Sequence, residues 1–203
     1  MNMLRKIGNV PVAQSVIGEM FPNIVGKSQK IRSLEQSGQV IRLKRGLYVV
    51  SKEVSGVDIS TELIANHLYG PSYVSMLTAL RSYGLIPEMV YATQSVTTKR
   101  ARHFENAVGR FDYFRCPLDY FSIGLRYQDG FIIASPEKAL CDLILNQHGV
   151  VFRYKKEMLQ YLEEDLRFDM EALRDLDADI IDRCTQCGKK KQTLILLKKM
   201  VIS

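Results

Sequence analysis

The sequence contains no tryptophan, three histidines and four cysteines among its 203 residues. Four cysteines are too few for the disulfide framework of a small secreted protein in a chain of this length. No apolar stretch approaches the roughly 20 residues that a membrane-spanning helix needs, and the first ten residues, MNMLRKIGNV, lack the apolar segment of a signal peptide. We therefore expect a cytoplasmic protein that does not contact a membrane.

The motifs of common catalytic and nucleotide-binding sites are also missing. The sequence contains no GxGxxG, GxxxxGKS/T, HExxH or GxSxG, and no Asp or Glu is followed two residues later by Lys, as in many metal-dependent nucleases. We therefore expect no enzymatic activity and no cofactor. An enzyme, such as a nuclease or an RNA-modifying protein, is kept as the third hypothesis, after the two DNA-binding functions given below.

One cysteine pair has the spacing of a metal or redox site. Cys184 and Cys187 form a CxxC motif, but a structural zinc site needs four ligands, and Cys116 and Cys141 are solitary. We expect ordinary thiols and no bound metal, with a zinc or redox site as the weaker alternative.

The positive charge is concentrated at the N-terminus. The chain has 28 Lys and Arg against 22 Asp and Glu, and residues 1–50 hold eight of the bases but two of the acids, so the whole net charge of +6 lies there. A basic segment on a neutral body is typical of a nucleic-acid contact, because phosphates that it neutralises release counterions. A solvated basic face is the alternative.

Residues 1–52 have the pattern of a winged helix-turn-helix domain. Residues 10–20 predict a short helix, and residues 26–37 predict a second one that ends at Gly38, which suits the left-handed conformation after a helix. Residues 39–51 then alternate as a β-hairpin. Helix, turn, helix and basic hairpin follow one another in this order in winged DNA-binding domains.

The second of these helices has a face suited to reading DNA. With 100° between successive residues, Ile31 and Leu34 point inward. Hydrogen-bonding side chains without negative charge occupy the opposite face, and we expect them to contact base edges in a major groove: Gln29, Arg32, Ser33 and Gln36. Lys27 and Lys30 lie near the start and flank of the helix, where we expect phosphates.

The hairpin supplies a second predicted contact. Arg42 and Lys44 are two residues apart and would share one face of a strand, and Arg45 lies at the tip beside Gly46. These three cations predict a site that binds the phosphates of the DNA backbone. Edge strands also carry Lys and Arg to prevent aggregation, so the hairpin alone does not decide between the two interpretations.

After the linker-like segment SKEVSGVDIS, the composition changes. Residues 60–150 combine helical patterns with β patterns between residues 89 and 135, including a hairpin turn at Asp129-Gly130, and another helix begins after an N-cap at Ser135. Residues 151–203 predict a helical tail. The predicted fold class is α+β: an N-terminal winged helix-turn-helix, a mixed α/β domain and a helical C-terminal extension.

Three segments together carry a family resemblance: SGQVIRLKRGLYVVS (37–51), PSYVSMLTALRSYGLIPE (71–88) and IIASPEKALCDLI (132–144). They resemble the AbiEi-type antitoxins of type IV toxin-antitoxin systems, in that order and over roughly residues 5–147. The middle segment is the most specific of the three.

The resemblance implies a bacterial protein with two activities. Its winged helix would bind inverted repeats in double-stranded promoter DNA and repress its own transcription, with contacts from the matched wing (Arg42, Lys44 and Arg45) and from the helix before it. Its second domain would counter a nucleotidyltransferase toxin without obligatory direct contact. The alternative hypothesis is a solitary winged-helix regulator that senses a ligand or protein through its second domain.

Overall fold

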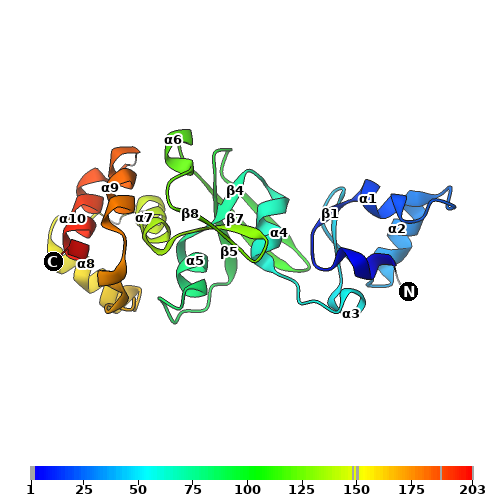
Figure 1. Ribbon diagram of the computed structural model, residues 1–203, viewed down its shortest axis with the longest axis horizontal. Helices are drawn as coiled ribbons and strands as arrows, with labels where there is room; N and C mark the ends of the chain where they lie inside the picture. Colours follow the sequence, from blue (N-terminus) through cyan, green and yellow to red (C-terminus); the bar gives the residue numbers. More distant parts are fainter. Residues whose placement is uncertain (1–2, 148, 150, 188, 203) are drawn as a thin grey trace.

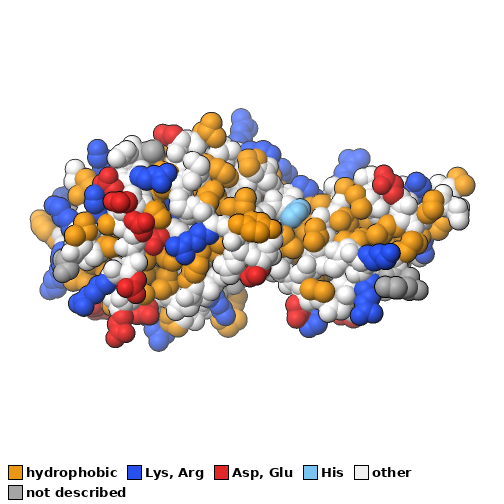
Figure 2. Space-filling view, in the orientation of Figure 1, with side chains coloured by type: hydrophobic (Ala, Val, Ile, Leu, Met, Phe, Trp, Pro, Cys, Tyr) orange, Lys and Arg blue, Asp and Glu red, His pale blue; other side chains and the backbone are white. Residues whose placement is uncertain are grey.

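The computed structural model describes residues 3–147, 149, 151–187 and 189–202 of an elongated molecule (Figure 1). An N-terminal lobe, residues 3–56, lies at one end, the C-terminal helices lie at the other, and a β-sheet lies between them. The outline narrows beside the N-terminal lobe on the face that Figure 2 shows. Within the described ranges, no helix is long and apolar enough to cross a membrane.

The N-terminal lobe combines short helices with a small sheet. In chain order its elements are η1 (Met3–Ile7), β1 (Val12–Ala13), α1 (Gln14–Glu19), α2 (Lys27–Gln36), β2 (Val40–Lys44), β3 (Leu47–Val50) and α3 (Lys52–Ser55). The strands are antiparallel and lie in the order β1-β3-β2. Helices and strands both contribute to one buried apolar core: Leu4, Ile17, Ile31, Leu34, Val40, Tyr48 and Val50.

Most of the local predictions for this lobe are confirmed. The predicted second helix is α2, Gly38 follows it with a φ of 69°, and the predicted hairpin is formed by β2 and β3. The helix expected over residues 10–20 is shorter, because Val12 and Ala13 pair with β3. The linker-like segment begins with the helical turn α3, which ends at Gly56 in the left-handed conformation.

The central part of the chain forms a mixed six-stranded sheet in the order β6-β7-β5-β4-β9-β8. Its elements are α4 (Thr61–Leu68), β4 (Ser72–Val74), α5 (Met76–Ser82), β5 (Ala92–Thr97), β6 (Arg102–Asn106), β7 (Gly109–Arg115), α6 (Leu118–Phe121), β8 (Leu125–Gln128), β9 (Phe131–Ala134) and α7 (Pro136–Asn146). Strand pairs β4-β9 and β5-β7 are parallel, and the other neighbours are antiparallel. The β pattern expected around Tyr120 is helical in the structure, as α6.

Helices cover both faces of this sheet. Tyr113 on β7 donates a hydrogen bond to the Ala65 carbonyl oxygen of α4, at 2.6 Å. The next residue, Phe114, lines a cavity together with Met76 of α5 and Leu143 of α7. Because neighbouring residues of a strand point to opposite faces, α4 lies on one face, and α5 and α7 lie on the other.

The C-terminal residues extend the core as a helical layer beside α7 (Figure 1). Its elements are α8 (Lys155–Gln160), the π-helical turn η2 (Tyr161–Asp165), η3 (Ala172–Asp175), α9 (Ala178–Cys187) and α10 (Lys191–Ile202). Lys198 of α10 pairs with Asp182 of α9 at 2.7 Å. The predicted α+β class and the helical C-terminal extension are confirmed.

The hairpin of the N-terminal lobe also packs on the central sheet domain. Val40, Tyr48 and Val50 belong to the core of the lobe, whereas Leu43 and Val49 are buried in the large cluster that contains the sheet. Asn106 of β6 donates a hydrogen bond to the Leu43 carbonyl oxygen, at 3.1 Å. Packing is therefore continuous across residue 52, where the sequence predicted the end of the first domain.

Candidate nucleic-acid interface

Helix α2 presents a polar face to solvent because its apolar residues are directed inward. Ile31 and Leu34 are 2% and 3% exposed, as the helical periodicity predicted. All four side chains predicted for the opposite face are exposed: Gln29, Arg32, Ser33 and Gln36. The only acid of the helix, Glu35, is half-buried. The exposed face thus offers amide, hydroxyl and guanidinium groups, which are the groups that bind base edges.

Two lysines lie at the start of this helix. Lys27 is its first residue, and a Cβ atom at Gly18 of α1 would lie 3.3 Å from Lys27 Cδ, so the glycine leaves room for the lysine stem. The Lys30 ammonium lies 5.1 Å from the centre of the Phe21 ring, within the range of a cation-π contact. Both residues lie at the start of α2, where the positive end of the helix dipole also favours an incoming phosphate.

The hairpin places its arginines in solvent. Arg42 and Arg45 are both exposed, and Arg45 lies at the tip, followed by Gly46 with a φ of 78°. The register of β2 against β3 shifts between Arg42 and Lys44. The sequence predicted Arg42 and Lys44 on one strand face, by simple alternation. The register shift interrupts that alternation.

Lys44 faces the central domain. Its ammonium donates a hydrogen bond to the Leu68 carbonyl oxygen at the end of α4. Burial lowers the pKa of Lys44 below its ordinary value, and the positive charges of Arg102 and Lys99 lower it further. The structure thus brings Lys44 together with two cations of the basic segment 99–102, a possible secondary phosphate contact in the sequence, whose proximity to Lys44 the sequence did not predict.

These three cations, Lys44, Lys99 and Arg102, form what we call the junction cluster. The Lys99 ammonium donates to the Gly70 carbonyl oxygen and lies 5.3 Å from the Tyr69 ring centre. The Arg102 guanidinium lies 5.7 Å from the Tyr69 ring and 4.8 Å from the Phe104 ring. In the part of the chain that the structure describes, no carboxylate lies within ion-pair distance of the cluster.

A buried network of polar side chains around α7 is the other group of residues that could form a catalytic or binding site. Lys138 Nζ lies 3.3 Å from Asp142 Oδ1, and Ser75 Oγ donates to Asp142 Oδ2 at 2.6 Å. Lys138 also donates to the Tyr120 carbonyl oxygen at 3.0 Å. All three network side chains belong to residues that are 0% exposed. Because these side chains are not accessible from solution, we do not assign a binding or catalytic role to the network.

The cysteines do not assemble into a metal site among the described residues, where no group of three potential ligands was found. Cys116, Cys141 and Cys184 are buried free thiols. The Cys187 side chain lies outside the described residues, so the expectation of ordinary thiols at the CxxC motif stays a prediction.

Comparisons with known proteins bear on the fold alone. No family model matches the sequence, and no curated protein matches it. The structure is similar to the crystal structure of the Rv2827c protein from Mycobacterium tuberculosis, with a TM-score of 0.55 and 11% sequence identity. The match covers 98% of this chain and 78% of that chain. At this identity, the two proteins share a chain arrangement.

Proposed function

We propose that this cytoplasmic protein is a DNA-binding antitoxin of a type IV toxin-antitoxin system, which represses its own promoter and counters a nucleotidyltransferase toxin. The observation that carries the DNA-binding part is the exposed face of α2. It presents Arg32 with Gln29, Ser33 and Gln36 and no exposed acid. This combination suits a major groove.

The order of the elements in the N-terminal lobe supports a winged helix-turn-helix. Helix α1 precedes α2, with residues 20–26 connecting the two, and the hairpin β2-β3 follows α2. Strand β1 completes a sheet in the order β1-β3-β2. In this arrangement α2 is the recognition helix and the β2-β3 loop, with Arg45 at its tip, is the wing that contacts phosphates.

The antitoxin part of the proposal rests on the family resemblance. The segments 71–88 and 132–144 come together in space, since Val74 pairs with Ile133 and Ser75 bonds to Asp142. Two of the three segments that carry the resemblance are thus neighbours in the central domain, where we propose that the antitoxin activity resides.

We expect the protein to bind the DNA upstream of its own coding sequence and to protect cells from the product of an adjacent nucleotidyltransferase gene. A gel-shift titration on that DNA and on a scrambled sequence of equal length measures the first activity. Growth of cells that express the toxin, with and without this protein, measures the second.

Specific binding with rescue supports the proposal. Specific binding without any rescue would instead favour the solitary regulator. Equal binding to both DNA sequences would contradict the repressor part, because phosphate contacts alone do not distinguish sequences.

A further inference from the structure

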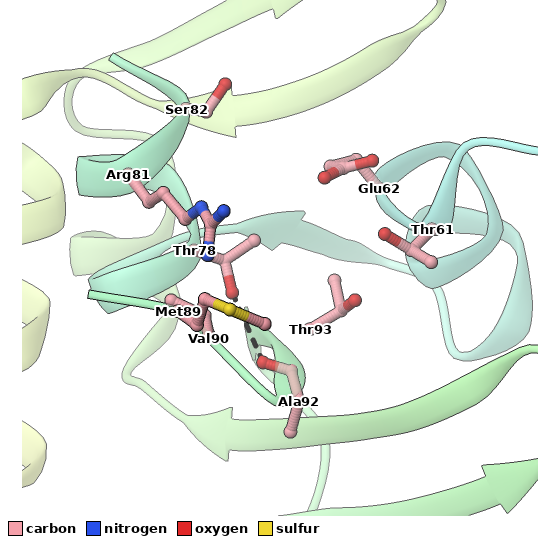
Figure 3. Close-up of a pocket in the computed structure, with 9 residues that line it drawn as sticks. All are labelled: Thr61, Glu62, Thr78, Arg81, Ser82, Met89, Val90, Ala92 and Thr93. Carbon is pink, nitrogen blue, oxygen red and sulfur yellow. Dashed lines mark hydrogen bonds between the residues drawn. The ribbon is translucent and has the colours of Figure 1, made fainter. Parts of the chain in front are cut away.

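A cavity of about 430 Å³ opens on the central domain between α4, α5 and β5 (Figure 3). It lies apart from the exposed face of α2 and from the junction cluster, and none of their residues lines it. Polar side chains from two helices meet an apolar segment that leads into β5. Its lining includes Glu62, Thr78, Arg81, Met89, Val90 and Ala92.

Two opposite charges border this cavity from different helices. Figure 3 shows the Arg81 guanidinium on α5 and the Glu62 carboxylate on α4 on opposite sides of the opening. Among the described residues they do not pair with each other: Arg81 Nη1 donates to the Glu88 carbonyl oxygen at 3.3 Å, and Glu62 Oε2 accepts from Ser60 Oγ at 3.1 Å. Each group keeps further hydrogen-bonding capacity, because a guanidinium has five donors and a carboxylate has about four acceptor sites.

The remaining walls are fixed by hydrogen bonds within the domain. Thr78 Oγ1 donates to the Ala92 carbonyl oxygen at 3.3 Å and accepts from the Gln94 amide at 2.9 Å. These bonds hold α5 against the start of β5. Met89 and Val90 supply apolar surface on the same side of the cavity as Thr78, across the opening from Glu62 (Figure 3). The cavity therefore combines a cationic side, an anionic side and an apolar wall between fixed elements.

We propose that this cavity binds a small zwitterion, a molecule with one carboxylate and one ammonium joined by a short aliphatic segment. Arg81 would bind the carboxylate, since a planar guanidinium matches it with two parallel hydrogen bonds. Glu62 would bind the ammonium, and the Met89 and Val90 side chains would contact the aliphatic segment. Amino acids and their longer-chain analogues are the chemical class that meets all three requirements.

Each of the two charged residues also lies near one end of its helix. Glu62 lies in the first turn of α4 and Arg81 lies in the last turn of α5, where their charges complement the helix dipoles. Stabilisation of a helix end would account for the presence of Glu62 or of Arg81. It would not account for both facing one cavity, and it predicts no ligand binding.

A series of ω-amino acids tests the assignment in the full-length protein. Glycine, β-alanine, 4-aminobutyrate and 6-aminohexanoate carry the same two charges at increasing separation, and isothermal titration calorimetry measures each affinity. We expect saturable binding that is tightest at one length. N-acetylation of the best ligand removes the ammonium charge and should weaken binding by about tenfold or more.

Two variants and a control assign the contacts. Arg81→Gln should weaken binding of the best zwitterion, and Glu62→Gln should weaken it while removing the penalty for N-acetylation. Arg174→Gln changes an exposed arginine that does not line the cavity and should bind as the unmodified protein does.

The proposal is wrong if none of the four ligands binds saturably, or if both cavity variants bind all four as the unmodified protein does. Loss of thermal stability in both variants, with no ligand binding to the unmodified protein, would assign the two charges to helix stabilisation instead. The titration requires no DNA and no toxin, so its outcome is independent of the proposed function.

Discussion

Replacing Asp142 with alanine is expected to lower the free energy of unfolding by about 3–5 kcal/mol. Asp142 is fully buried and is the counter-charge of Lys138, 3.3 Å away, which is itself 0% exposed. Its removal would leave an ammonium without an anion in the core and would take the hydrogen-bond acceptor from Ser75. Urea unfolding followed by circular dichroism measures the change, provided that the slope against urea is unaltered.

Two comparisons separate this effect from a general loss of charge. Asp182→Ala breaks the more exposed pair with Lys198 and should change stability much less. The double variant Lys138→Met and Asp142→Leu removes both buried charges and keeps apolar volume, so it should regain most of the lost stability. If Asp142→Ala and Asp182→Ala lost equal amounts of unfolding free energy, the interaction between Lys138 and Asp142 would be no stronger than an exposed ion pair. The inference from burial would then be wrong.

Removing three cations from the N-terminal lobe should produce the largest change in DNA affinity. In the variant Lys27→Gln, Arg42→Gln, Arg45→Gln, three proposed phosphate contacts are lost. Each contributes roughly 0.9 to the slope of log affinity against log salt concentration, so the slope should fall by about 2.7. Fluorescence anisotropy titrations at several salt concentrations measure this slope, and the affinity should fall most at low salt.

Three exposed lysines at the other end of the molecule provide a charge-matched control, Lys189, Lys191 and Lys199. Their replacement with glutamine removes the same charge and should leave the slope close to that of the unmodified protein. An equal fall of the slope in both triple variants would mean that DNA responds to the net charge of the protein. The proposed interface on the N-terminal lobe would then be wrong.

The sequence predicted those features that depend on neighbouring residues. The inward direction of Ile31 and Leu34 follows from helical periodicity, and Asp129-Gly130 forms the expected turn with both residues at positive φ. Ser135 accepts a hydrogen bond from the Lys138 amide, as an N-cap does. Each of these structures is determined within about four residues of sequence.

Features that depend on distant residues were not predictable in this way. Lys44 has the same local pattern as Arg42, yet it contacts Leu68 because the outer face of the hairpin packs on the central domain. The junction cluster joins residues more than fifty positions apart. Strand β4 has only three residues, too few for a period-two pattern, and its pairing with β5 and β9 defines it.

The same packing bears on the domain boundary that the sequence predicted near residue 52. The sequence divided the chain into residues 1–52, 60–150 and 151–203, and an uneven charge distribution supported the first boundary. In the structure, Leu43 and Val49 are 4% and 0% exposed within the large core cluster. A fragment that begins near Ser60 would lose these apolar contacts, so single substitutions in the full chain are the better way to separate the two proposed activities.

Whether Arg32 reads a base is the most direct test of the proposal that α2 is a recognition helix. The measurement is the affinity of the protein for its upstream DNA and for a set of single base-pair variants of that DNA, at one fixed salt concentration. Arg32→Ala should lose about 1–3 kcal/mol of binding free energy and should no longer discriminate at one base pair, whereas Arg45→Ala should weaken every sequence alike. If Arg32→Ala also weakened all sequences alike and kept the full base preference, α2 would not read the major groove and the account of this protein as a sequence-specific repressor would be contradicted.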